Sequence, residues 1–253
     1  MAKITAIINQ KGGVGKSTTS QSLAAGLSLK GFKVLLIDMD SQGNLSFSVG
    51  ANKAAVSILE VLKQEATAAE AIQTVGNLDI IPASISLAGA DMQLTEMGKE
   101  YRLKEALEPV KNNYDYIVID TPPALGILTI NALTAADDII IPAQADIYSI
   151  DAIGQLSSTV KAVKQYTNSK LSIKGILLTR YSDRTILSRD LADMIQRTAE
   201  QLSTKLFKAT IREAIGIKEA QAQKQDIFSY SGNSKVAADY MQFVEEFLES
   251  EKV

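Results

Sequence analysis

The chain has 253 residues, 46% of them hydrophobic, and a formal net charge of −3. It contains no cysteine and no histidine, which excludes disulfides, zinc sites with Cys or His ligands, iron–sulfur ligation and Ser-His-Asp catalysis. Carboxylates, lysine, arginine, hydroxyls and backbone N–H groups remain, and these are sufficient for phosphoryl transfer, which depends on positioning and charge neutralisation.

The first residues, MAKITAIINQ, are too few and too polar for a signal peptide, and no apolar run approaches the ~20 residues of a membrane span. We therefore expect a cytoplasmic protein. Charge is unevenly distributed, because residues 160–224 carry 13 Lys/Arg and 6 Asp/Glu, whereas the rest carries 13 and 23. Such a segment suits a surface that meets phosphates, but the solvated faces of amphipathic helices would explain it equally well.

Apolar runs alternate with helical repeats along the whole chain. In chain order they predict a strand at 4–9, a helix at 17–30, a strand at 33–37, helices near 56–63 and 68–74, a strand at 78–81, a helix at 101–112, strands at 116–119 and 138–141, a helix at 153–166, a strand at 173–178, and helices at 187–202 and 234–249. Strands that are apolar throughout indicate a parallel sheet. We expect one α/β domain over residues 1–253, with a mostly parallel twisted sheet covered by helices on both faces.

A glycine-rich segment joins the first predicted strand to the first predicted helix. Its glycines would let backbone N–H groups approach a triphosphate, and the helix N-terminus would add partial positive charge. Lys16 would reach the β and γ oxygens, and the Ser17 hydroxyl would ligate Mg²⁺. The usual Walker A pattern requires glycine where this chain has Gln10, and a second lysine precedes the glycines, so the pattern is a deviant Walker A. The predicted ATP-binding residues of this P-loop NTPase are Lys11, Gly12, Gly13, Val14, Gly15, Lys16, Ser17 and Thr18.

Three aspartates follow predicted strands. Asp38 and Asp40 end the second strand, and Asp120 ends the strand at 116–119. Because ligands of such sheets collect at the carboxyl ends of strands, these residues should converge with the glycine-rich loop. A carboxylate there can hold Mg²⁺ through its water shell or orient an attacking water.

The segments NQKGGVGKST, LLIDMDSQGN, YIVIDTPPALG and GILLTRYSDRT together resemble the ParA/MinD family of deviant Walker ATPases, over nearly the whole chain. The resemblance implies an ATP-sandwich homodimer in which Lys11 reaches the phosphates bound by the other subunit, as an arginine finger does. It implies that Asp40 positions the attacking water and that Asp120 is the Walker B carboxylate. The catalytic residues that the resemblance implies are Lys11, Lys16 and Asp40, and the implied magnesium site involves Ser17, Asp38, Asp40 and Asp120. Residues 42–44 would form a switch segment that follows the nucleotide state. Arg180 and Arg212 would contact the nucleotide.

Within the family, the segments DMDSQGN and RYSDRT are more similar to ParA/Soj partition proteins than to MinD. The last residues, VEEFLESEKV, are mostly acidic, and anionic lipid would repel them, so we expect no membrane binding. The resemblance implies slow hydrolysis stimulated by a ParB-like partner, and non-specific DNA binding on the nucleoid that weakens with salt. The candidate DNA-binding residues are Arg184, Arg189, Lys205, Lys208, Arg212, Lys218 and Lys224. The family often has an arginine near Gly216 that this chain lacks, and Lys218 or Arg212 would substitute for it.

Two alternatives remain open. One is a membrane-associated positioning ATPase of the MinD type. The other is an ATP-dependent synthetase on the same scaffold, for which the sequence identifies no substrate pocket. No helix-turn-helix precedes the first strand, so we do not expect sequence-specific repression by this chain alone.

Overall fold

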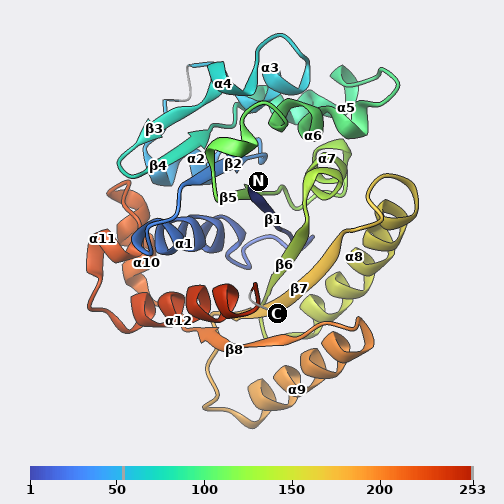
Figure 1. Cartoon of the computed structure of the whole chain (residues 1–253). Helices are drawn as coiled ribbons and strands as arrows, with labels where there is room; N and C mark the ends of the chain where they lie inside the picture. Colours follow the sequence, from blue (N-terminus) through green and yellow to red (C-terminus); the bar gives the residue numbers. More distant parts are fainter. Residues whose placement is uncertain (53–54, 252–253) are drawn as a thin grey trace.

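A computed structural model describes residues 1–52 and 55–251. Within these residues a single sheet runs in the order β3-β4-β2-β5-β1-β6-β7-β8, and every neighbouring pair is parallel except β3–β4 (Figure 1). The strands are β1 (Lys3–Ile7), β2 (Val34–Asp38), β3 (Gln73–Val75), β4 (Leu78–Ile81), β5 (Tyr116–Asp120), β6 (Asp138–Ala143), β7 (Ser172–Thr179) and β8 (Leu206–Ile211).

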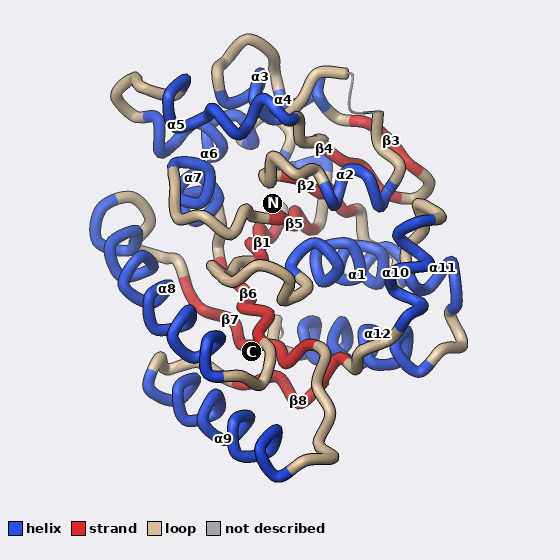
Figure 2. The backbone as a smooth tube through the Cα atoms, turned by 180° about the vertical axis from the view of Figure 1, so that it is seen from behind, coloured by secondary structure: helices blue, strands red, loops and turns tan. Residues whose placement is uncertain are grey.

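Helices cover both faces of this sheet (Figure 2). One face is covered by α1 (Lys16–Leu29), α2 (Asn44–Val49), α10 (Ile215–Ala222), α11 (Ile227–Ser231) and α12 (Lys235–Glu249). The other is covered by α3 (Ile58–Leu62), α4 (Ala68–Ala71), α5 (Ala90–Gln93), α6 (Arg102–Leu107), α7 (Ile127–Ala135), α8 (Ile147–Tyr166) and α9 (Ile186–Gln201). No helix within the described residues has the length and apolar character needed to cross a bilayer.

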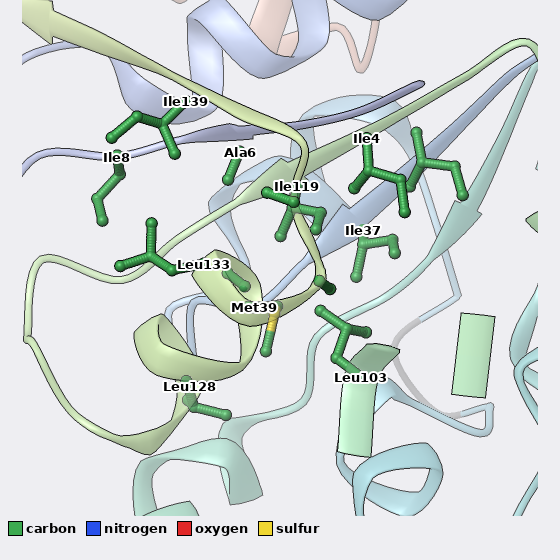
Figure 3. Packing of buried hydrophobic residues seen from close by; sticks show 14 of the residues in the cluster. Ile4, Ala6, Ile8, Ile37, Met39, Leu103, Ile119, Leu128, Leu133 and Ile139 are labelled. Atoms are coloured by element: carbon green, nitrogen blue, oxygen red, sulfur yellow. The ribbon is translucent and has the colours of Figure 1, made fainter. Parts of the chain in front are cut away.

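Successive side chains of the central strands enter two separate hydrophobic clusters. In β2, Leu35 and Ile37 join the cluster beneath α6 and α7, whereas Val34 and Leu36 join the one beneath α1 and α12. This is the period of two expected of a strand buried on both faces. Figure 3 shows the first cluster, where Ile37 and neighbouring strand residues face α7. The sheet is therefore held on both sides, and its strand ends are fixed in space.

Helices α1 and α12 approach closely at Gly26. A Cβ atom placed there would lie 2.6 Å from Cγ2 of Val244, so only glycine allows the two helices this contact. The approach holds α12 against the helix that begins at the glycine-rich loop.

The predicted fold class is confirmed, and most predicted elements lie within two residues of the observed bounds. The helix predicted at 68–74 is wrong beyond Ala71, because residues 73–75 form β3, antiparallel to β4. The helix predicted at 101–112 ends at Leu107, because Pro109 has no backbone N–H to donate to the Glu105 carbonyl and so cannot continue the helix. Strand β8 and helices α2, α5, α7, α10 and α11 were not predicted. Residues 252 and 253, which belong to the acidic tail discussed above, lie outside the described residues.

Candidate functional site: a phosphate-binding loop at the carboxyl edge of the sheet

The glycine-rich loop leaves β1 and enters α1 with free backbone donors. Gly15 is the N-cap of α1, and its φ of 86° lies in the left-handed region that favours glycine. Among the residues that the structure describes, no side chain caps this end, and the first turn contains no acidic residue. The N–H groups of the first turn and the helix dipole are therefore available to an anion.

Residues from two other strands hold the loop in place. The Asn9 side chain donates a hydrogen bond to the carbonyl of Pro142 at 2.7 Å and accepts one from the Lys11 N–H at 2.9 Å. The Thr179 hydroxyl donates to the Val14 carbonyl at 2.8 Å. The loop is thus attached to the ends of β6 and β7, which fixes its shape before any ligand arrives.

A cavity of about 630 Å³ lies over the loop and is lined by its glycines, Lys16, Ser17, Thr18 and Asp40. Lys16 is only 8% exposed, and its Nζ lies 3.4 Å from the Lys11 carbonyl. Burial lowers the pKa of Lys16, while the charges of Asp120 and Asp40 raise it. A buried lysine beside free backbone donors gives this cavity the chemistry of a polyphosphate site.

Asp120 and Asp38 are register neighbours at the ends of β5 and β2. Burial and, to a smaller extent, the neighbouring charge of Asp38 together raise the pKa of Asp120 to about 8, while the hydroxyls of Ser17 and Ser20 act to lower it. Ser20 Oγ lies 3.2 Å from Oδ1 of Asp120, whereas Oδ2 is buried and has no hydrogen-bond partner among the described residues. An unpartnered buried carboxylate oxygen beside the Ser17 hydroxyl fits a magnesium site.

Among the described residues no group of three Asp, Glu, His or Cys side chains could hold a metal ion by itself. Mg²⁺ commonly uses one or two carboxylates, water and substrate phosphates rather than an all-protein cage. Ser17, Asp120 and the nearby Asp40 are the residues that would hold the ion, which would arrive together with the phosphates.

Asp38 holds the start of α2 and does not line the cavity. Its carboxylate accepts hydrogen bonds from the Ser46 N–H at 2.8 Å, the Ser46 hydroxyl at 2.6 Å and the Asp40 N–H at 3.1 Å. The Ser46 hydroxyl also accepts a bond from the Ala83 N–H at 2.9 Å, so α2 is joined to the chain after β4. Burial raises the pKa of Asp38 to about 6. This geometry favours an organising role for Asp38, whereas Asp40 lines the cavity and accepts a bond from the Gln42 N–H at 3.0 Å.

Lys11 turns away from the cavity toward the chain between β6 and α8. Its ammonium forms an ion pair with Asp146 and lies 3.2 Å from Oε1 of Gln144. Asp146 is the N-cap of α8 and accepts a bond from the Ser149 N–H at 2.8 Å. The two charged side chains retain 25% and 30% exposure, so this pair lies at the rim of the site.

A second cavity, of about 150 Å³, adjoins the first, and both are lined by Gly15, Thr18, Arg180, Lys218 and Gln221. Arg212 lines only the second, where Asp239 forms a two-pronged ion pair with its guanidinium. Both predicted nucleotide contacts, Arg180 and Arg212, are therefore near the loop.

The candidate DNA-binding residues do not form one face. Arg184 and Arg189 are exposed after β7, and Lys218 lies at the rim of both cavities. Nζ of Lys224 lies 5.7 Å from the ring centroid of Phe47 in α2. Lys205 precedes β8, at the opposite edge of the sheet, and its Nζ is 3.7 Å from a carboxylate oxygen of Glu246. Lys208 is an exposed residue within β8. The assignment of these residues to DNA stays a prediction.

Sequence reasoning missed several residues that build the site. They follow β1 and β6 or lie in α2 and α12, and they are Asn9, Ser46, Gln144, Asp146 and Asp239. Asn9 lies within the NQKGG segment, but the deviant Walker A pattern assigns no role to the residue at that position. Ser46 is 8 residues from Asp38, and the others are farther from their partners, for example by 135 residues between Lys11 and Asp146, so no short motif indicates them.

Comparisons with known proteins agree with this geometry. The AAA_31 family, described as an AAA domain, matches residues 2–173. The chain is 43% identical to the sporulation initiation inhibitor protein Soj of Bacillus subtilis, over 97% of this chain and 98% of that protein. It is 38% identical to the chromosome-partitioning ATPase Soj of Treponema pallidum, over 98% of each. Its structure is similar, with a TM-score of 0.86 and 35% identity, to a cobyrinic acid a,c-diamide synthase of Mycobacterium smegmatis with bound ATP analogue and magnesium, over 100% of this chain and 96% of that one.

One assignment follows from three findings: the similarity to two Soj proteins over their full length, the matching family, and the deviant glycine-rich loop. The chain belongs to the ParA/Soj family of chromosome-partitioning P-loop ATPases.

Proposed function

We propose that this chain is a partition ATPase that binds Mg-ATP, dimerises around it, and hydrolyses it slowly until a ParB-like partner accelerates the reaction. The observation that carries the ATP site is the convergence of an uncapped α1 N-terminus, buried Lys16 and the unpartnered Asp120 oxygen on one cavity. Magnesium would neutralise phosphate charge there, while Lys16 and the loop N–H groups orient the triphosphate. Asp40, which lines the cavity, would hold the attacking water.

Lys11 would supply positive charge across the dimer interface in this proposal. In the single chain it is bound to Asp146 at the rim of the site. A lysine at that rim supports a function across a subunit interface, where it would exchange the carboxylate for the phosphates of the neighbouring subunit. Positive charge supplied in this way stabilises the charge that develops on the transferring phosphoryl group.

Non-specific DNA is the proposed partner of the ATP dimer, which would place the protein on the nucleoid in the cytoplasm. The support is a set of exposed basic side chains, namely Arg184, Arg189, Lys218 and Lys224. These side chains lie on or near elements that border the ATP cavity, so nucleotide state and DNA affinity would be coupled.

The test of the DNA proposal is retention on a non-specific duplex. We expect retention with Mg-ATP, none with Mg-ADP, and progressive loss as salt is raised, because phosphate contacts release counterions. The Asp40→Ala variant should remain on DNA with ATP because it does not hydrolyse the nucleotide. Equal retention with ADP and ATP would contradict the switch.

The membrane alternative receives no support from α12. Its apolar side chains Val236, Tyr240, Phe243 and Phe247 are buried in the cluster that covers the sheet. An interfacial helix would need such a face free for lipid. Co-sedimentation with anionic vesicles in the presence of ATP would establish the membrane function instead.

A second candidate function follows from the M. smegmatis structure, whose description names a synthase. A synthetase would use the same ATP site to activate a carboxylate. ATP turnover that depends on a small carboxylic acid and produces an amide would support it, whereas turnover stimulated by DNA and a partner protein supports partition.

A further inference from the structure

Arg212 is held by one carboxylate from the C-terminal helix. Asp239 Oδ2 accepts from Arg212 Nε at 2.6 Å, and Oδ1 accepts from Nη2 at 2.7 Å. Oδ2 also accepts from the backbone N–H of Arg212 at 3.1 Å. The backbone N–H and two guanidinium nitrogens of Arg212 thus donate to one carboxylate. The pair of bonds from the guanidinium fixes both its plane and its position.

The carboxylate itself stands on a rigid base. Asp239 lies in α12 beside Tyr240, which is fully packed between the helix and the sheet and also lines the 150 Å³ cavity. The Asp239 side chain is 10% exposed, whereas that of Arg212 is 47% exposed and reaches the open side of the same cavity. Nε and Nη2 of Arg212 therefore face Asp239, so another group would contact this guanidinium through its flat faces or through Nη1.

That cavity continues directly into the phosphate cavity through Gly15, Thr18 and Gln221. A ligand whose phosphates lie on the loop would extend its opposite end into the smaller cavity. Guanidinium planes stack well on aromatic rings, and a wall held in place before binding costs a ligand less entropy than a mobile side chain.

We infer that Asp239 is a positioning residue that holds Arg212 as a wall of the pocket for the nucleotide base, and so makes α12 part of the ATP site. The inference rests on the proposed function and deepens it. It also assigns Arg212 to the nucleotide rather than to DNA, because the charge of its guanidinium is already matched by Asp239.

The chain offers a matched control in Glu246. This residue lies on the same helix and accepts bonds from the backbone N–H groups of Lys208 and Ala209 in β8, at 3.1 and 3.0 Å. It attaches α12 to β8 as Asp239 attaches it to the end of that strand, but it lines neither the phosphate cavity nor the smaller cavity. Loss of packing between helix and sheet would affect both variants, whereas loss of the base wall affects only one.

The experiment measures the Kd of a fluorescent ATP analogue with Mg²⁺ for the unmodified chain, Asp239→Asn, Arg212→Ala, the double variant and Glu246→Gln. We expect Asp239→Asn to weaken binding roughly three- to tenfold, the loss associated with freeing one long side chain. The double variant should bind no worse than Arg212→Ala, because Asp239 acts through that arginine. Glu246→Gln should bind as the unmodified chain does. In steady-state hydrolysis KM should rise for Asp239→Asn while kcat stays constant.

Equal binding by Asp239→Asn and the unmodified chain would overturn the inference and leave the ATP site intact. So would additive losses in the double variant, or an equal loss in Glu246→Gln. Failure of the unmodified chain to bind the nucleotide would instead overturn the proposed function itself.

Discussion

Removing the charge of Asp146 should promote dimerisation. The Asp146→Asn variant retains an N-cap for α8, because asparagine caps helices as well as aspartate does, but it loses the ion pair with Lys11. The pair is partly exposed, so we assign it about 0.5–1 kcal/mol, the upper part of the range for surface pairs. A symmetric dimer breaks two such pairs, which gives about 1–2 kcal/mol and a dimer Kd that is roughly five- to thirtyfold lower.

Sedimentation equilibrium with Mg-ATP measures that constant. Asp151→Asn is the control, because it removes the same charge from an exposed position on the same helix. A dimer Kd for Asp146→Asn that equals or exceeds that of the control would refute the idea that Lys11 must leave Asp146 before it can act across the interface.

Three other perturbations test the fold, the carboxylates and the trans lysine. Gly26→Ala should lower the free energy of unfolding by roughly 1 kcal/mol because its Cβ would overlap Val244, whereas Gly154→Ala in open space should raise it by roughly 0.5–1 kcal/mol, as chemical denaturation will show. Without nucleotide and Mg²⁺, thermal stability should fall as the pH rises from about 4 to about 8, because Asp120 keeps its proton in the folded chain and loses it in the unfolded chain. The Asp120→Asn variant is the control. A Tm of the unmodified chain that stays flat or rises over this pH range, relative to that variant, would contradict the burial of the Asp120 carboxyl. Lys11→Ala should bind ATP normally but lose dimerisation and hydrolysis, and hydrolysis at the unmodified rate would exclude the trans role.

The strands that carry the site could be predicted because they are buried on both faces. A run such as YIVID is apolar until the residue where the strand meets the ligand, so the pattern itself shows where Asp120 stands. The same holds for Asp38 at the end of β2. Parallel order then brings both carboxylates to one edge, which the register confirms.

The elements that were missed lack that contrast between apolar strand and polar end. Strand β8 (LFKATI) pairs only with β7 at the sheet edge and has exposed Lys208 in its middle, so it shows no continuous apolar run. Helix α7 (ILTINALTA) is buried all round and shows no amphipathic repeat. Strand β3 follows α4 after one residue and pairs with β4, a long-range contact that the local sequence does not show.

The polar partners of the site could not be predicted for a different reason. Asp146 and Asp239 are ordinary helix residues in sequence, one an N-cap and one in the second turn of α12. Their roles arise only when the fold brings β6 beside β1 and α12 beside β8. For the same reason charge counting along residues 160–224 overstated the basic surface, since Glu246 and Asp239 lie outside that segment and neutralise Lys205 and Arg212 within it.

Calorimetric titration of ATP into the chain tests the central claim most directly. With excess Mg²⁺ we predict saturable binding of one nucleotide per chain, and no detectable binding to Lys16→Ala, which retains the loop but lacks the buried ammonium. Absence of binding to the unmodified chain, or equal binding by both proteins, would contradict the account of the site.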